Sequence, residues 1–149
     1  MKLASKIIST VFGIGYFPIA PGTLTSLIVI FLYKLFLHRL SWPLYLLLFF
    51  LLFFVGVVAS SKCESESNKK DPANIVIDEA VGQFLVLFQM GEEWLPLLLS
   101  FFLFRLFDIV KPIPIRKVEN FPSGWGIMMD DLLAAIYAGV IINLYIILK

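Results

Sequence analysis

The sequence contains very few of the residues that form disulfides and zinc sites. It has one cysteine, Cys63, and one histidine, His38. A single cysteine excludes an internal disulfide, and a structural zinc site needs a cluster of cysteines and histidines that this chain lacks. Any metal site is therefore expected to use oxygen ligands.

Charged residues are also scarce. Only 15% of the 149 residues are charged, and the formal net charge is +1. A nucleic-acid-binding domain would show a basic patch or stripe, so nucleic acid is not an expected partner. Hydrophobic residues make up 60% of the chain, and the mean hydropathy is +0.92. The length predicts one domain, residues 1–149, and the composition predicts that most of it lies in lipid or in a dry interior.

Three long apolar segments predict helices that cross a membrane, which takes about 20 apolar residues each. They are Thr23–Leu37, Pro43–Ala59 and Leu132–Leu148. The one charge among them, Lys34, lies near the end of the first segment, where a long side chain can reach the interface. We therefore expect an all-α, polytopic membrane bundle with about three full spans.

A fourth apolar region, residues 79–107, is interrupted in the middle. Its two halves, Ala80–Met90 and Trp94–Phe107, are each short for a complete crossing, and Gly91 lies between them as a natural turn. The pattern predicts a short helical hairpin. It leaves open whether this hairpin re-enters the membrane or spans it.

The distribution of cations predicts the orientation. Most of them lie in the N-terminal segment and in the two polar segments 60–75 and 111–126. These cations are Lys2, Lys6, Lys62, Lys69, Lys70, Lys111, Arg116 and Lys117. By the positive-inside rule, these segments are expected on the cytoplasmic side.

Carboxylates recur at the ends of the apolar segments. Asp78 and Glu79 begin one segment, Asp108 ends another, and Asp130 and Asp131 begin the last. A charge in such a setting is costly unless it is paired, bound to a metal or hydrated, so we expect one shared polar site at the cytoplasmic face. Helix capping is the simpler explanation for any single pair, because acidic groups are favourable at a helix N-terminus.

Cations accompany these acids. Arg105 lies three residues before Asp108 and can pair with it on one helix face, but Lys111 and Arg116 follow closely, which is more positive charge than one aspartate needs. Arginine and lysine bind phosphate oxygens, and clustered carboxylates suit Mg²⁺. Carboxylates, cations and a membrane surface together indicate metal-assisted displacement at the phosphorus of a phosphorylated lipid.

Three segments carry a resemblance to a known family. They are Asp78-Glu79-x-x-Gly82, Phe104-Arg105-x-Phe107-Asp108-x-x-Lys111-Pro112-x-Pro114-Ile115, and Gly126-Ile127-Met128-x-Asp130-Asp131-x-x-Ala134, and Ala20-Pro21-Gly22-Thr23 adds a fourth element. In these segments the chain resembles phosphatidylglycerophosphatase A, a bacterial lipid phosphatase family. Ala80 and Ala135 depart from residues that are common in the family.

The resemblance implies Mg²⁺-dependent conversion of phosphatidylglycerophosphate to phosphatidylglycerol and phosphate in the bacterial inner membrane. It maps the family's motif carboxylates onto five catalytic candidates, which are Asp78, Glu79, Asp108, Asp130 and Asp131. We assign the metal to Asp78, Glu79, Asp108 and Asp131. We assign the substrate phosphate to Arg105, Lys111 and Arg116.

Several alternatives stay open from the sequence. The nucleophile is either a metal-activated water or one of the aspartates. A phosphotransferase acting on a lipid alcohol would use the same groups, and a non-catalytic membrane scaffold or transporter subunit would use the acids to line a polar pore. A histidine-dependent lipid phosphatase is rejected, because Trp125 stands where that signature needs its histidine.

Overall fold

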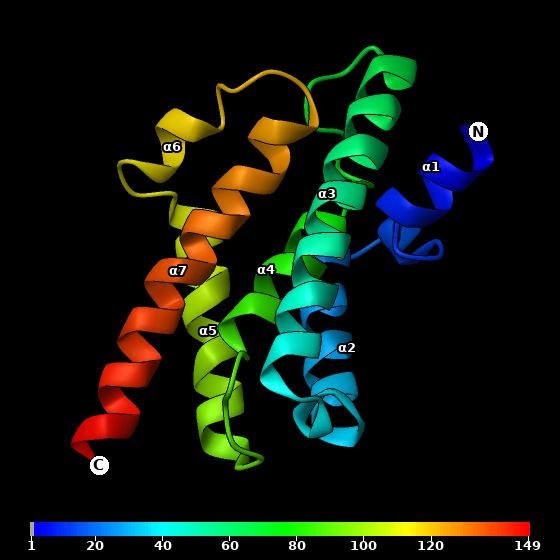
Figure 1. The fold of residues 1–149 in the computed structure, drawn as a ribbon. Helices are drawn as coiled ribbons and strands as arrows, with labels where there is room; N and C mark the ends of the chain where they lie inside the picture. Colours follow the sequence, from blue (N-terminus) through cyan, green and yellow to red (C-terminus); the bar gives the residue numbers. More distant parts are fainter. Residues whose placement is uncertain (1) are drawn as a thin grey trace.

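The computed structural model describes residues 2–149, which form helices joined by loops (Figure 1). The elements in chain order are α1 (Lys2–Ser9), η1 (Ile14–Tyr16), α2 (Pro21–Leu35), η2 (Leu37–Arg39), α3 (Trp42–Ser67), α4 (Ile77–Val86), α5 (Trp94–Val110), α6 (Ile115–Val118) and α7 (Gly124–Leu148), where η denotes a 3₁₀ helix. The all-α prediction is confirmed for this part of the chain.

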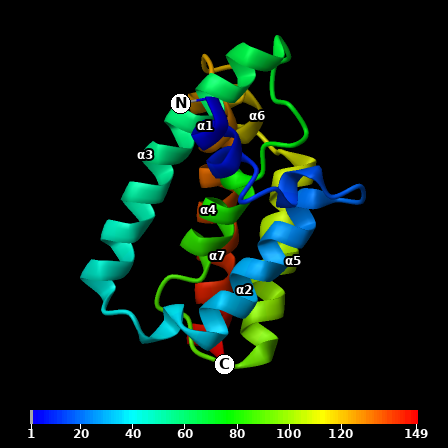
Figure 2. The ribbon, with the colours of Figure 1, turned by 90° about the vertical axis from the view of Figure 1, so that its right-hand side faces the viewer.

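The long helices run roughly side by side and define two ends of the molecule. The upper end, as drawn in Figure 1, contains α1, the residues that follow α3, and α6. The lower end contains η2, the α4–α5 connection at residues 87–93 and the C-terminus (Figure 2). The N-terminal segment and both polar segments therefore share one end of the molecule, as the charge distribution predicts.

Within residues 2–149, two helices, α3 and α7, are long and apolar enough to cross a membrane. Their 26 and 25 residues correspond to about 39 and 38 Å at the rise of an α-helix. The first predicted span, α2, has only 15 residues and ends at Leu35, so its length is about 22 Å. The structure thus supports two spans by length and composition, and three full spans are not confirmed.

Two predicted helix boundaries are wrong, and both helices are longer than expected. α3 continues past Ala59 to Ser67, because one side of this extension packs inward through Ser60 and Cys63. α7 begins at Gly124 rather than Leu132, and the Gly124 backbone N–H donates a hydrogen bond to Ser61 Oγ at 3.0 Å. Contacts between α3 and α7 therefore stabilise helical turns whose polar residues predict loops when the sequence is considered alone.

Helices α4 and α5 occupy the region predicted as a hairpin. α4 runs down from the upper end, and α5 returns beside α7 (Figure 1). Both pack extensively against α7. Gly82 allows α4 to approach both α5 and α7 closely, because a Cβ atom there would lie 2.6 Å from the Phe104 ring and 3.3 Å from the Asp131 backbone oxygen. The three helices form the framework of the candidate site, while re-entry of the hairpin into the membrane stays a prediction.

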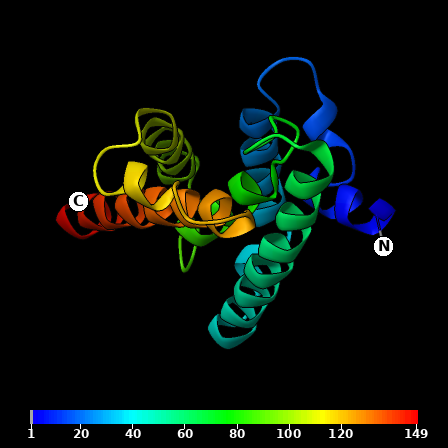
Figure 3. The ribbon, with the colours of Figure 1, turned by 90° about the horizontal axis from the view of Figure 1, so that it is seen from above.

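Helix α3 leans away from α7 toward the lower end (Figure 3). The space between α3, α2 and α4 is filled in part by aromatic side chains. Tyr45 stacks on Phe84 with ring centroids 4.1 Å apart, and the Tyr45 hydroxyl donates a hydrogen bond to the Phe84 carbonyl oxygen at 2.6 Å. These contacts hold the lower half of α4 against α3.

Candidate active site

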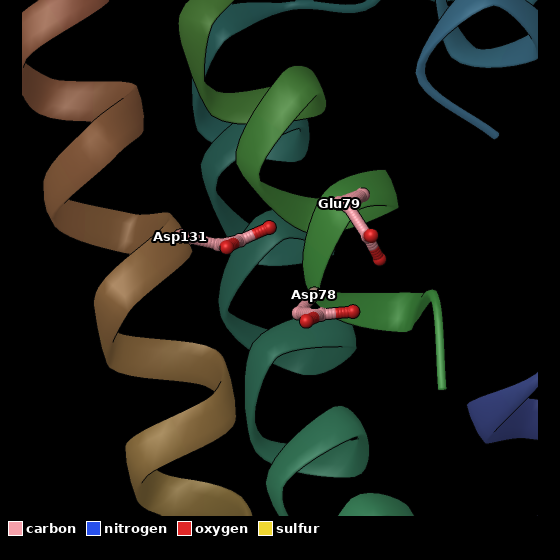
Figure 4. Close-up of side chains that lie close together, drawn as sticks. All are labelled: Asp78, Glu79 and Asp131. Atoms are coloured by element: carbon pink, nitrogen blue, oxygen red, sulfur yellow. The ribbon is translucent and has the colours of Figure 1, made fainter. Parts of the chain in front are cut away.

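Three carboxylates from two helices meet near the upper end. Asp78 and Glu79 lie in the first turn of α4, and Asp131 lies in the second turn of α7. Each offers one oxygen such that all three oxygens lie within 4.8 Å of one another. Figure 4 shows Asp131 reaching from α7 toward the start of α4. Asp78 and Asp131 are almost completely buried, with 8% and 2% of their surface exposed.

The start of α4 is fixed by contacts with the N-terminal segment. The Val76 backbone N–H donates a hydrogen bond to the Ser9 carbonyl oxygen at 2.9 Å, so the end of α1 anchors the residue before α4. The beginning of α2 is equally close, since Gly22 packs against the Glu79 side chain. The Ala20–Thr23 element, which resembles a motif of the family, therefore lies beside the carboxylates.

Arg105 connects the acids of α5 and α4. Its Nη1 atom lies 2.6 Å from Asp108 Oδ2 and 3.8 Å from Glu79 Oε1. Asp108 adds a further negative charge beside Glu79 and Asp131, but it lies outside the group of three. Of the four carboxylates assigned to a metal, three thus form one group, and the fourth, Asp108, is paired with Arg105.

Asp130 faces a different partner from Asp131. Lys111 Nζ donates a hydrogen bond to Asp130 Oδ2 at 2.6 Å and a longer one to Glu119 Oε1 at 3.4 Å. The other oxygen of Asp130 accepts the Asp131 backbone N–H at 2.9 Å. Adjacent acids on a helix point in different directions, and here one binds a lysine while the other joins the carboxylate group.

The surroundings of Lys111 keep it charged. Burial alone would lower the pKa of Lys111, but the hydrogen bond and the negative charge of Asp130, together with Glu119, outweigh it and raise that pKa above its ordinary value. Lys111 is therefore a cation throughout the neutral pH range, held beside the carboxylate group by Asp130.

Arg116 is the third cation that we assign to the substrate phosphate. Arg116 is exposed on α6, and within residues 2–149 it makes no ion pair, so it does not join the group of carboxylates directly.

Asp71 was not predicted as a site residue, because the charged residues around it predict a solvated segment. Although Asp71 is exposed, the packing around its carboxyl group raises its pKa, and the charge of Lys111 opposes that shift. Only long-range packing brings Asp71 into this network.

Several buried polar atoms of the site have no hydrogen-bond partner among the described residues. The acceptors are Asp78 Oδ1, Glu79 Oε2 and Asp131 Oδ2, and the donor is Arg105 Nε, since Arg105 Nη1 is already paired with Asp108. Like charges about 4 Å apart repel by about 4 kcal/mol at an intermediate dielectric constant. Arg105 is shared with Asp108 and Lys111 is held by Asp130, so neither neutralises the group of three. The acceptor oxygens fit a divalent cation, and the free Nε donor of Arg105 fits an anionic oxygen.

Comparisons with known proteins agree with this chemistry. The sequence model of the phosphatidylglycerophosphatase A family matches residues 7–146. A Bacteroides thetaiotaomicron protein with the provisional name phosphatidylinositol-3-phosphatase is 42% identical over 144 residues, which cover 91% of this chain and 89% of that protein.

Two proteins named phosphatidylglycerophosphatase A are also similar. The Haemophilus influenzae protein is 41% identical over 133 residues, covering 88% of this chain and 82% of its own length. The Escherichia coli protein is 35% identical over 133 residues, covering 88% and 77%. No solved structure matches the chain significantly.

Proposed function

Because the chain belongs to the phosphatidylglycerophosphatase A family, we propose that it hydrolyses the phosphomonoester of phosphatidylglycerophosphate, releasing phosphatidylglycerol and phosphate. The observation that supports this most directly is the pairing of unsatisfied groups at the site. Carboxylate oxygens without hydrogen-bond partners lie in the same site as a buried arginine donor without one, the Nε atom of Arg105. A phosphate bound together with a cation would satisfy both sets at once.

The proposed cofactor is Mg²⁺, held by Asp78, Glu79 and Asp131. These side chains fit the ion because one oxygen of each converges within 4.8 Å and because each has a buried oxygen without a hydrogen-bond partner. Asp108 is a further oxygen ligand that we assign from the sequence, and its present partner is Arg105. When bound, the cation supplies positive charge against the phosphoryl oxygens and lowers the repulsion among the carboxylates.

Arg105 and Lys111 are proposed to stabilise the charge that develops on the phosphoryl oxygens. Arg105 does so with its buried Nε, which lacks a hydrogen bond, while its Nη1 is paired with Asp108. Lys111 is oriented by Asp130, which makes Asp130 a positioning residue in this scheme. Arg116 is proposed to attract the anionic head group from its exposed place on α6.

The phosphorus–oxygen bond to the glycerol is broken, and its electron pair leaves with the glycerol oxygen, which takes up a proton. The attacking group is water or an aspartate of the site. An aspartate nucleophile would leave a phosphoenzyme that rapid acid quenching with radiolabelled substrate can trap, whereas direct attack by water leaves none. This experiment decides between the two routes.

The proposed setting is the bacterial inner membrane, with the upper end of the molecule on the cytoplasmic side. Helices α3 and α7 cross the bilayer, α2 with η2 forms a third crossing, and α4 with α5 forms the short hairpin. Support comes from the excess of lysine and arginine at the upper end and from the apolar character of α3 and α7. In this arrangement the site lies where a lipid head group would reach it.

The test is phosphate release by the purified protein in detergent micelles, with and without Mg²⁺. We expect release from phosphatidylglycerophosphate, loss on addition of EDTA, and loss in Asp131→Asn. Glu66→Gln, an exposed change on α3, serves as the matched control and should keep full activity. Equal release by wild type and Asp131→Asn would overturn the site assignment, and release that resists EDTA would overturn the metal.

A second substrate belongs in the same assay because of the Bacteroides relative. Phosphatidylinositol-3-phosphate carries the same phosphomonoester on a different head group. The proposal requires faster release from phosphatidylglycerophosphate. No release from either lipid would favour the alternative of a non-catalytic scaffold or transporter subunit.

A further inference from the structure

An apolar groove begins beside the candidate active site and runs away from it. Helices α2, α3 and α4 form its walls, and the segment after α1 closes its upper part. Every side chain that lines it is apolar, and its volume is about 350 Å³. The site itself faces α7, so the groove is a separate feature on the other side of α4.

The groove and the site are joined through the first turn of α4. Ile77 and Ala80 line the groove and immediately flank Asp78 and Glu79, which belong to the site. The groove then follows α4 down to Phe84, a distance of about 10 Å at the helical rise. An occupant would thus have one end near the carboxylates and the other end toward the lower half of the molecule.

The other two walls run in the same direction. On α3 the lining residues extend from Val55 down to Leu48, and on α2 they extend from Val29 to Leu32. In Figure 2, α2 and α3 slant in the same direction as they descend, so the groove runs from the upper toward the lower end of the molecule. A lipid chain that hangs from a head group at the upper end would follow the same line.

The composition of the groove selects among apolar occupants. Its walls carry no polar side chain along about 10 Å of α4. An extended peptide would bury backbone N–H and C=O groups there without hydrogen-bond partners, which is costly. A hydrocarbon chain has no such groups, and the groove begins at the turn of α4 that carries two of the site carboxylates.

We propose that this groove holds one acyl chain of the lipid substrate and thereby positions its head group at the carboxylates. The inference rests on the proposed lipid phosphatase function and extends it to chain-length selection. Lipid tails are as apolar as the groove, so moving a chain from the bilayer into it contributes little affinity. The groove instead orients the substrate. This effect is measured as a difference in rate between lipids of different chain length.

The test compares two substitutions at neighbouring residues of α3. Leu48 lines the lower end of the groove, while Leu47 is 65% exposed on the outer face. Leu48→Trp should block the lower end and so discriminate against long chains. Leu47→Trp adds the same bulk outside the groove and is the control for folding and detergent binding.

The measured quantity is the ratio of kcat/KM for dipalmitoyl to dioctanoyl phosphatidylglycerophosphate. We expect this ratio to fall by about tenfold in Leu48→Trp and to stay unchanged in Leu47→Trp. An unchanged ratio in Leu48→Trp overturns the proposal. An equal fall in both variants also overturns it, because the effect would then come from bulk on α3 rather than from the groove.

A photochemical measurement separates the groove from the catalytic proposal. Dipalmitoyl phosphatidylglycerophosphate with a diazirine in one acyl chain is bound and irradiated, and the labelled residues are mapped by mass spectrometry. Labels on the groove walls that disappear in Leu48→Trp support the proposed acyl-chain groove. They do so even if no phosphate is released, since that second result would contradict only the proposed reaction. Labels spread evenly over the outer faces of α3 and α7 overturn the groove even if the enzyme is active.

Discussion

The α-carbon of Gly22 packs directly against the carboxylate of Glu79. A Cβ atom on Gly22 would lie 2.0 Å from Glu79 Oε1 and 2.6 Å from its carboxyl carbon, closer than any real contact. The start of α2 and the start of α4 are therefore fitted to each other at the site. A side chain at position 22 is opposed by the space that Glu79 occupies rather than by backbone conformation.

Replacing Gly22 with alanine should displace Glu79 and leave the fold largely intact. We expect kcat/KM to fall by about a hundredfold, the order of loss that misplacing a catalytic group by 1 Å can cause. Phosphate release is the measurement. Gly139→Ala is the matched control, because a Cβ atom there meets nothing within 4 Å, and its activity should be unchanged. Full activity in Gly22→Ala would show that Glu79 has no fixed role.

The pH dependence of activity should report on the pair formed by Lys111 and Asp130. Asp130→Asn removes the main group that raises the pKa of Lys111, so burial, which lowers that pKa, is opposed mainly by Glu119. Lys111 then loses its proton at lower pH than in the wild type. We expect the alkaline limb of the pH–rate profile to move to lower pH.

The longer contact of Lys111 provides the comparison for this experiment. Glu119→Gln removes the carboxylate at 3.4 Å and keeps the one at 2.6 Å, so it should move the alkaline limb less than Asp130→Asn does. A larger movement in Glu119→Gln, or none in either variant, would contradict the role of Asp130 in holding Lys111.

Close packing of the three site helices should depend on Gly82. In Gly82→Ala the new methyl group would meet the Phe104 ring at 2.6 Å, and the backbone oxygen of Asp131 lies 3.3 Å away. We expect a loss of about 1–3 kcal/mol in the free energy of unfolding, typical of an overpacked core. Thermal unfolding in detergent is the measurement.

A second change tests the cause of that loss. Leucine in place of Phe104 removes the ring that the methyl group strikes, so Gly82→Ala should cost less in a Phe104→Leu background than in the wild type. Gly91→Ala, where a Cβ atom has open space, should change stability little. Additive effects of the two substitutions would mean that the ring is not what opposes alanine at position 82.

The lower end of the molecule should contribute little to the reaction. His38 Nε2 lies 3.2 Å from Glu92 Oε1, and the Glu92 side chain is 62% exposed. Even when fully charged, an exposed contact of this kind contributes at most about 1 kcal/mol, so Glu92→Gln should lower stability by no more than that and leave phosphate release unchanged. A strong loss of activity would place part of the chemistry at the end opposite the carboxylates.

The helical class and the grouping of polar segments at one end were predictable because both depend on local patterns. Long apolar runs indicate helices wherever they occur, and the positions of lysine and arginine show which loops share a side. Helix boundaries were less accurate. Asp130 and Asp131 lie in the second turn of α7 rather than at its start, because Gly124 and its neighbours join the helix through contacts with α3.

The sequence by itself determined which residues could carry the chemistry, since acids, arginine and lysine stand out in an apolar chain and match the motifs of one family. The tertiary structure alone decided how they are divided. Asp131 joins Asp78 and Glu79, Asp130 binds Lys111, and Asp108 binds Arg105. The physical reason is that side chains from different helices meet only through long-range packing. That packing depends on contacts, such as the one between Gly22 and Glu79, that no local pattern specifies.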